Sequence, residues 1–153
     1  PLTQLPNYRS MCEKGYRMIA DRQSFSMVLF DLDDFSQINK RLGYRQADAL
    51  LLEAVAQLKG LIRSDCLLSR YEGDSFLVLA PNYTRRQAEI LAERLRIELN
   101  IVVAEIQSNY IQLTATFSVI ESDGKHPLQT LLETAEDALL LAKQAGKNQT
   151  TRA

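Results

Sequence analysis

The strongest strand signal in the chain is a continuous apolar run, Met27-Val28-Leu29-Phe30, which stops at the acidic sequence Asp31-Leu32-Asp33-Asp34. A run that is apolar at every position is typical of a strand in the middle of a sheet, where both faces are covered. Side chains two positions apart on a strand share a face. We therefore expect Asp31 and Asp33 to point together at the end of this strand, with Leu32 pointing the other way.

A polar turn lies further along the chain, between two short strand-like runs at residues 66–70 and 76–80. The turn contains Glu72, Gly73 and Asp74, and Pro81 ends the second run, so the segment is predicted to be a β-hairpin. A glycine at its tip would let the backbone approach a phosphate closely, and the neighbouring carboxylate could hold a metal ion. The alternative is an ordinary turn, since Gly, Asp and Ser are common in turns.

Apolar residues recur at helical spacing in four other segments. Asn7 is placed to cap the first helix, and Thr84 and Gln87 form a capping box for the third. Pro127 begins the fourth helix and Gly146 ends it. The apolar faces are Tyr8, Met11, Cys12 and Ile19 in the first helix; Leu51, Val55, Leu58 and Ile62 in the second, over residues 46–62; Ala88, Leu91, Ala92, Leu95 and Leu99 in the third; and Leu128, Leu131, Leu132, Ala135, Leu139 and Ala142 in the fourth.

A second pair of strands is predicted between the third and fourth helices. Residues 101–106 form one strand, a polar turn follows at 107–109, and residues 111–119 form the other. The latter alternates apolar and polar side chains, which predicts one buried face and one polar face. Helices and strand pairs in this order favour an α+β fold, a mixed β-sheet with helices packed on its faces.

Composition narrows the class of protein. At 153 residues and 46% hydrophobic, the chain is long enough to form one domain with its own core. A net charge of −1 provides no excess of positive charge for binding the phosphate backbone of a nucleic acid. Cys12 and Cys66 lack the paired spacing of a metal or redox site, so we interpret them as reduced thiols of a cytoplasmic protein. We expect no membrane segment in this chain, because no apolar stretch approaches the roughly 20 residues that span a bilayer.

The acidic cluster has two interpretations. Carboxylates at the carboxyl end of a buried strand commonly hold Mg²⁺ and a nucleotide triphosphate. Alternatively, these acids cap the helix that follows. A calcium loop is excluded, because its twelfth position would be Leu42 instead of the required glutamate.

Several separated motifs together resemble the GGDEF domain, the diguanylate cyclase family of bacterial signalling. They are the opening Leu2-Thr3-Gln4-Leu5-Pro6-Asn7, the run Asp31-Leu32-Asp33-Asp34-Phe35-Ser36-Gln37-Ile38-Asn39 with Gly43, Asp48 and Leu51, the hairpin Arg70-Tyr71-Glu72-Gly73-Asp74-Ser75-Phe76, and the closing Ala142-Lys143-Gln144-Ala145-Gly146-Lys147-Asn148. The resemblance covers nearly the whole chain. It implies a palm-type, ferredoxin-like core and a single domain over residues 1–153, excised from a longer protein with neighbouring domains.

The resemblance also implies a reaction, the condensation of two GTP molecules into cyclic di-GMP across a homodimer, with Mg²⁺ bridging the phosphates. The roles it assigns are metal ligation by Asp31, the Leu32 carbonyl and Asp74; phosphate contact by Gly73, Lys143 and Lys147; and guanine recognition by Asn39 and Asp48. For the lysines the alternative is stabilisation of a helix C-terminus. For Asn39 and Asp48 it is ordinary loop and helix-start polarity.

Departures from the family pattern fall within the signature. Glu72 stands where the family has a glycine, and Ser75 stands where it has its catalytic glutamate, so Asp74 is the residual acid of the turn. Serine cannot supply an anionic ligand or take a proton at neutral pH. Outside the signature, Ser36 replaces a lysine, Tyr44 a histidine, and Ala47 and Ser118 glycines.

The family's product-inhibition motif, Arg-x-x-Asp, appears as Arg63-Ser64-Asp65-Cys66, with the aspartate one position early. We expect that inhibitory site to be lost or remodelled, because a one-residue offset in an extended segment turns a side chain to the opposite face. The sequence thus predicts a domain without cyclase activity, acting as a regulatory GTP-binding or interaction module. The alternatives are a weakly active cyclase and a dimerisation scaffold that binds no nucleotide.

Overall fold

The fold is built on a central five-stranded sheet. The computed structural model describes residues 8–106 and 113–153, with the backbone alone described at 102–106. Strands follow the order β2-β3-β1-β4-β5, and their bounds are β1 Phe25–Leu32, β2 Leu67–Glu72, β3 Ser75–Pro81, β4 Ala115–Glu121 and β5 Thr150–Arg152. Neighbours are antiparallel from β2 to β4, whereas β5 pairs with β4 in parallel. The sheet is therefore mixed, as predicted.

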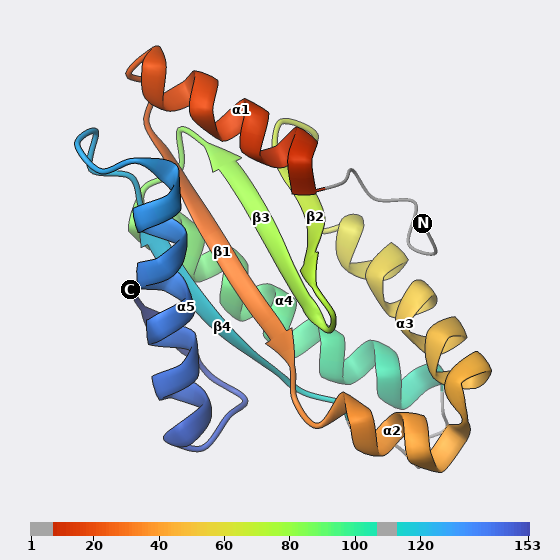
Figure 1. Cartoon of the computed structure of the whole chain (residues 1–153). Coiled ribbons are helices and arrows are strands. Elements are labelled where there is room, and N and C mark those ends of the chain that lie inside the picture. Colours follow the sequence, from red (N-terminus) through yellow and green to blue (C-terminus); the bar gives the residue numbers. More distant parts are fainter. Residues whose placement is uncertain (1–7, 107–112) are drawn as a thin grey trace.

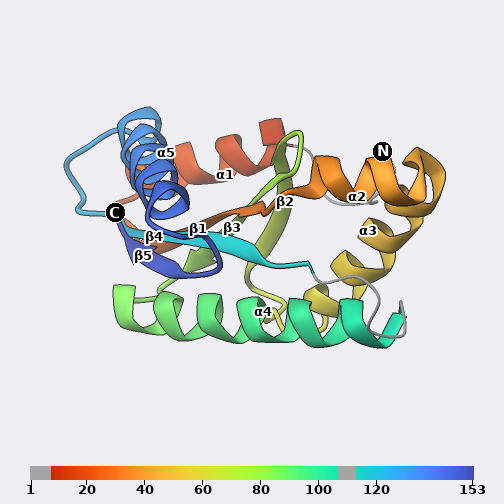
Figure 2. The same ribbon diagram turned by 90° about the horizontal axis from the view of Figure 1, so that it is seen from below.

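Helices cover both faces of this sheet (Figures 1 and 2). Helices α1 (Tyr8–Ala20) and α5 (Leu128–Gln144) lie on one face, and α4 (Arg85–Ile106) crosses the other. Helices α2 (Phe35–Leu42) and α3 (Tyr44–Lys59) follow β1 and close one end of the molecule. The arrangement confirms the predicted α+β fold with helices packed on the faces of a mixed sheet.

The alternation of side chains along β1 divides the interior into two apolar clusters. Val28 and Phe30 belong to the cluster beneath α2, α3 and α4, whereas Met27 and Leu29 belong to the cluster beneath α1 and α5. The ring of Phe30 stacks between two other rings, with centroids 5.3 Å from Phe76 and 4.7 Å from Phe117. Because the alternation continues past Phe30, the next side chain, Asp31, lies on the α5 side of the sheet.

Strand β4 carries the polar face that the alternation predicted, but that face is buried. Thr116 and Ser118 are both fully shielded from solvent, as is Phe117 on the opposite face. The strand pairs with β1 on one side and β5 on the other, and α5 packs over it. A buried polar row needs partners within the protein, and Thr116 finds one in the site described below.

The predicted strand at residues 101–106 is wrong, because α4 continues without interruption to Ile106. The β-branched residues there favour a strand by propensity, but no glycine or proline stands between Leu99 and Ile106, and Leu99 is still buried as part of the helix's apolar face. Once the packed part of α4 has formed, each added residue gains a helical hydrogen bond, and this outweighs the weak local preference for a strand. The predicted turn at 107–109 and residues 111–112 lie outside the described residues. Strand β5, which the pattern of the sequence did not reveal, takes the free edge of β4.

Most helix predictions agree with the structure. The Thr84 and Gln87 capping box is present, with the Gln87 backbone N–H donating to Thr84 Oγ1 at 3.2 Å and the Thr84 N–H to Gln87 Oε1 at 2.9 Å. Helix α3 begins two residues earlier than expected and ends at Lys59, so Ile62 packs against the core from the following loop. The predicted cap at Asn7 and the opening motif lie outside the described residues.

Both cysteines are free, as expected. Within the described segments, no helix is long and apolar enough to cross a membrane.

Candidate functional site

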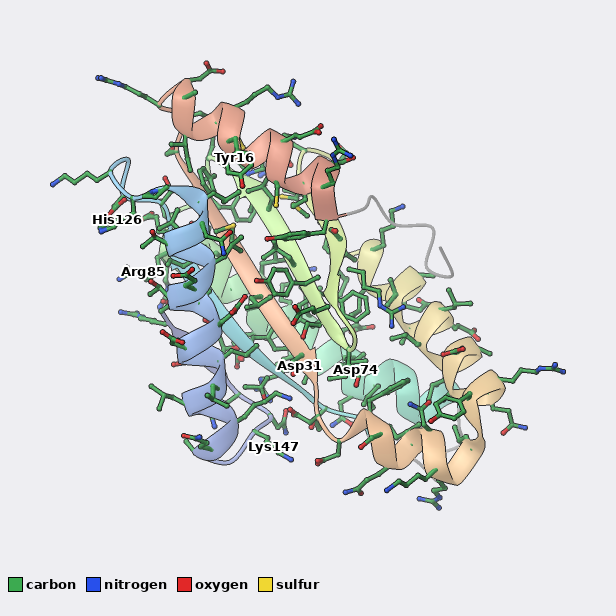
Figure 3. All side chains as sticks on the ribbon, viewed as in Figure 1. Tyr16, Asp31, Asp74, Arg85, His126 and Lys147 are labelled. Atoms are coloured by element: carbon green, nitrogen blue, oxygen red, sulfur yellow. The ribbon has the colours of Figure 1, made fainter. Side chains whose placement is uncertain are left out.

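The predicted hairpin and the acidic end of β1 meet at one edge of the sheet (Figure 3). Asp31 pairs in strand register with Ser75 of β3, and the Leu32 backbone N–H donates to the Asp74 carbonyl at 3.1 Å. Burial raises the pKa of the Asp74 carboxyl, and the nearby charge of Asp31 raises it further, whereas Arg70 and Lys143 oppose the shift. The carboxylates of Asp31 and Asp74 are therefore electrostatic neighbours.

The tip of the hairpin is open. Gly73 has φ +46°, and a methyl group built there would meet nothing within 4 Å. Its carbonyl accepts a hydrogen bond from Arg70 Nε at 2.8 Å, and the pairing of β2 with β3 shifts register between Arg70 and Glu72. Glu72 is exposed beside this tip. The turn thus leaves space for a ligand at Gly73, with an added carboxylate next to it.

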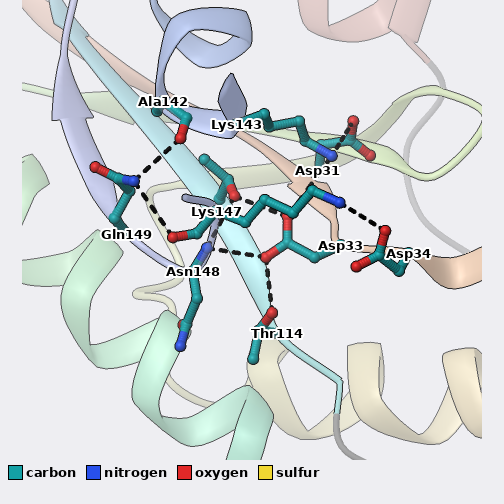
Figure 4. A network of polar contacts seen from close by, with 10 residues as sticks. Asp31, Asp33, Asp34, Thr114, Ala142, Lys143, Lys147, Asn148 and Gln149 are labelled. Atoms are coloured by element: carbon teal, nitrogen blue, oxygen red, sulfur yellow. Dashed lines mark hydrogen bonds and ion pairs between the residues drawn. The ribbon is translucent and has the colours of Figure 1, made fainter. Parts of the chain in front are cut away.

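Lys143, near the end of α5, points into the acidic cluster (Figure 4). Its Nζ lies 2.9 Å from Asp31 Oδ2 and 3.6 Å from Asp33 Oδ1. One ammonium group can reach both carboxylates only if they share a face. The expected convergence of Asp31 and Asp33 is confirmed, and Leu32 is buried on the opposite side in the other apolar cluster.

Asp33 is a buried carboxylate with a full set of hydrogen bonds. Its Oδ1 accepts from Thr116 Oγ1 at 2.7 Å, and its Oδ2 accepts from Thr114 Oγ1 at 2.7 Å and from the Asn148 backbone N–H at 3.0 Å. Only 3% of its side chain is exposed. Sequence reasoning did not include Asp33 among the site residues, because its partners come from the start of β4, with the residue before it, and from the turn after α5, far away in the chain.

Lys147 approaches the cluster from that same turn. Its Nζ lies 2.6 Å from Asp34 Oδ1, and both Lys147 and Asn148 have positive φ, at 62° and 43°. Asp34 makes no side-chain hydrogen bond to the start of α2, although it occupies the capping position. The interpretation of the acids as helix caps therefore fails for Asp33 and Asp34, whose carboxylates bind partners from distant segments instead.

Asn39 and Asp48 come from two consecutive helices, α2 and α3, that meet at Gly43. The side-chain oxygen of Asn39 is buried and has no hydrogen-bond partner among the described residues. Asp48 is half-buried, and the neighbouring Ala47 is completely buried in the core. An unpartnered buried acceptor costs free energy unless a ligand or water supplies a donor. This supports a binding role for Asn39, and the roles of both residues stay predictions.

The donor set at the hairpin suits a magnesium ion that arrives with a nucleotide. Among the described residues no group of three or more His, Cys, Asp or Glu side chains is placed to hold a metal. Asp31 and Asp74 offer two carboxylates, with the Leu32 carbonyl as a third oxygen. Mg²⁺ is usually bound by one or two carboxylates together with substrate phosphates and water. The residues present therefore fit Mg²⁺ carried by a triphosphate, and they do not form a closed protein-only site.

The altered inhibitory motif has internal partners. Arg63 Nε lies 3.5 Å from Asp65 Oδ1, and the Arg63 guanidinium lies 5.9 Å from the centre of the Tyr83 ring. Arg63 also lines an open cavity of about 210 Å³ together with Arg94 and Ile90. The loss or remodelling of this inhibitory site stays a prediction.

Comparison with known proteins identifies the family. Residues 1–149 match the family described as diguanylate cyclase, GGDEF domain. The chain is 26% identical over 152 residues to diguanylate cyclase DgcP of Pseudomonas aeruginosa, covering 97% of this chain and 23% of that protein. It is 28% identical over 150 residues to diguanylate cyclase VdcA of Vibrio cholerae, covering 96% of this chain and 44% of that one. The chain thus spans less than half the length of either relative.

A solved structure gives the same result. The crystal structure of diguanylate cyclase SiaD from Pseudomonas aeruginosa, in complex with its activator SiaC, superimposes with a TM-score of 0.90 at 28% identity. The match covers all of this chain and 60% of that chain. The family match over residues 1–149 and the agreement of the whole fold with SiaD lead to one conclusion: the chain belongs to the GGDEF domain family.

Proposed function

We propose that this chain is a GGDEF domain of cyclic di-GMP signalling that binds GTP with Mg²⁺ but does not make cyclic di-GMP. The observation that carries the proposal is the strand register, in which Ser75 lies directly opposite Asp31. Directly opposed residues on antiparallel strands have neighbouring side chains on the same face of the sheet. An acid at position 75 would therefore stand beside Asp31, and the hydroxyl of Ser75 provides neither its charge nor its basicity.

The charge around Asp31 argues in the same direction. Lys143 already neutralises this carboxylate in the structure, and Asp74 is a weaker acid than usual because burial and Asp31 raise its pKa. When bound, Mg²⁺ would be held by Asp31, the Leu32 carbonyl and Asp74, and it would neutralise charge on the phosphates and activate the attacking 3′-hydroxyl. Without an acid at position 75, the site keeps two carboxylates that can bind Mg²⁺ with GTP. It lacks the third carboxylate that would help to hold the metal during the reaction.

The remainder of the binding cradle supports retention of GTP. The open tip at Gly73 admits a phosphate, and Lys143 and Lys147 supply two ammonium groups beside it. The unpartnered oxygen of Asn39 can accept from the guanine N–H groups, and Asp48 can accept from them as well. A carboxylate and an amide oxygen favour guanine over adenine, because the Watson–Crick edge of guanine presents two adjacent donors, N1–H and the N2 amino group, whereas that of adenine places an acceptor, N1, beside its amino group.

The activity of the relatives favours one alternative. Both curated relatives reported above are diguanylate cyclases, so a weakly active enzyme that uses Asp74 with Mg²⁺ is the second candidate. Their greater length supports a role for this domain beside other domains of a longer signalling protein, and SiaD is complexed with a separate activator. Regulation by a neighbouring domain, a partner protein or a second copy of the chain is part of the proposal.

One pair of measurements tests the proposal. The purified protein is titrated calorimetrically with GTP and with ATP, each with and without Mg²⁺, and the GTP mixture is analysed by chromatography for cyclic di-GMP. We expect binding of GTP that requires Mg²⁺, weaker binding of ATP, and no cyclic product. Asp31→Ala should reduce GTP binding, and Asp137→Ala, an exposed change on α5, should not.

Each other outcome selects a different function. Steady formation of cyclic di-GMP that stops on Asp74→Ala would establish the weak cyclase. Equal affinities for GTP and ATP would refute the guanine site. GTP binding that is the same with and without Mg²⁺ would refute the magnesium site. If neither nucleotide binds, the remaining function is that of a dimerisation scaffold that binds no nucleotide.

A further inference from the structure

We propose that Lys143 is a built-in cation that occupies the metal-binding face of Asp31 until nucleotide phosphates draw it away. Divalent metal then binds well only together with the nucleotide. This inference concerns the regulation of the same site and rests on the proposed function for its biological meaning. The geometry that points to it is the 2.9 Å contact between Lys143 Nζ and Asp31 Oδ2.

The position of the ammonium group is fixed by the fold. Lys143 follows Ala142, which is buried where α5 packs on the sheet. Its side chain is 22% exposed and that of Asp31 27%, so the pair is mostly withdrawn from solvent. A second carboxylate, Asp33, lies 3.6 Å away and is itself held by Thr114, Thr116 and the Asn148 backbone. The fold therefore positions two carboxylates, those of Asp31 and Asp33, around the ammonium group of Lys143.

A divalent ion cannot share this place with the ammonium group. A metal on Asp31 needs the carboxylate oxygen at close range, and it would meet a like charge within a partly desolvated site, where repulsion is less screened than in water. Binding of free metal must therefore first displace Lys143 from Asp31. The lysine would then exchange its contacts with two carboxylates for water alone.

Nucleotide phosphates change this balance. A triphosphate offers several anionic oxygens to Lys143, so the lysine can leave Asp31 and keep an anionic partner. Lys147 can make the same exchange from Asp34, which lies at 2.6 Å. The vacated carboxylate then accepts the metal that the phosphates bring with them. Metal and nucleotide are coupled positively through Lys143, and by linkage the coupling is equal in both directions.

Metal binding without nucleotide tests this directly. Mn²⁺ serves as the probe, titrated into the whole protein in the absence of any nucleotide, with the free ion measured by electron paramagnetic resonance. We compare wild type with Lys143→Met, which removes the ammonium group and keeps an unbranched side chain of similar length with a similar preference for helix. We expect Lys143→Met to bind one Mn²⁺ about tenfold or more tightly than wild type, as expected when a nearby like charge is removed.

Two further variants define the site of binding. Lys59→Met is the matched control, because Lys59 is an exposed lysine in the last turn of α3, and it should leave Mn²⁺ binding unchanged. Asp31→Asn, added to Lys143→Met, should abolish the gain. If Lys143→Met does not fold by circular dichroism, Lys143→Gln provides the same loss of charge with a polar side chain.

The outcomes separate this inference from the proposed function. Equal Mn²⁺ affinity in wild type and the folded Lys143 variant would overturn the inference, even if GTP binds as proposed. So would tight Mn²⁺ binding by the wild type without nucleotide. Tighter Mn²⁺ binding in the variant supports the inference, even if calorimetry finds no GTP binding and the proposed function fails.

Discussion

The backbone N–H of Asn148 donates a hydrogen bond to Oδ2 of Asp33 at 3.0 Å, across a separation of 115 residues in the chain. The same N–H lies 3.1 Å from Thr116 Oγ1, so the turn after α5 is joined both to β4 and to the segment that follows β1. Because Asn148 lies between Lys147 and the start of β5 at Thr150, this contact holds both segments in position. Asp33 thus organises the site without being assigned any contact with substrate.

Asp33→Asn should lower the free energy of unfolding by about 2–3 kcal/mol. An amide offers only one acceptor oxygen, so its NH₂ group would face at least one of the three donors from Thr114, Thr116 and Asn148. Lys143 would also lose the negative charge of Asp33. Urea unfolding followed by circular dichroism measures the change. Asp137→Asn, on the exposed side of α5, is the control, and an equal loss in both variants would refute the organising role of Asp33.

Glu93 should contribute stability that depends on pH. Its hydrogen bond with Arg96 lowers the pKa of Glu93 from the ordinary 4.5 to about 2. A folded pKa below the unfolded one stabilises the protein above the unfolded pKa, and this contribution is lost as pH falls through the folded pKa. Because 44% of the Glu93 side chain is exposed, we expect only about 1 kcal/mol.

The test is Glu93→Gln measured by urea unfolding at several pH values. The variant should be less stable than wild type at pH 7, and the difference should shrink between about pH 4.5 and 2, the window set by the two pKa values. Glu133→Gln, an exposed change on α5, is the comparison. A difference between Glu93→Gln and wild type that is constant from pH 7 to pH 2 would contradict the ion-pair explanation.

Asn39→Ala should reduce discrimination between GTP and ATP. The buried oxygen of Asn39 lacks a partner among the described residues, so we expect it to accept from guanine and to contribute about 1–2 kcal/mol to GTP binding. Calorimetry with both nucleotides measures the ratio of affinities. Gln37→Ala, also on α2 but exposed, should leave the ratio unchanged. If Asn39→Ala weakens GTP and ATP equally, Asn39 does not read the base.

Glu72→Gly combined with Ser75→Glu should restore some cyclase activity in a forced dimer. The change places a carboxylate beside Asp31 by the register of β1 and β3, and it removes an exposed acid from the open tip at Gly73. Chromatographic detection of cyclic di-GMP is the measurement, with Ser75→Gln and Glu72→Gly as the matched inactive control. A double variant that folds, binds GTP tightly and makes no product would place the lesion elsewhere, at Ser36, Ala47 or the dimer geometry.

Local patterns in the sequence were enough to predict the elements whose signals are strong. The run of β1 is visible because burial of both faces makes every position apolar, and the stripes of α4 and α5 because burial of one face imposes a period of 3.6. The hairpin around Gly73 is visible from its turn residues. Motif spacing identified the family, and it singled out Asp31, Asp74 and Lys143, which the fold brings together.

Other features were decided only by tertiary structure, because they depend on pairing between distant segments. Residues 101–106 became helix because α4, which is packed through Leu99, continues without a break to Ile106, and β5 exists because β4 offers it an edge. The role of Asp33 needed partners from two distant segments: Thr114 and Thr116 at the start of β4, and Asn148 after α5. The capture of Asp31 by Lys143 likewise requires α5 to lie over β1, which local sequence patterns do not encode.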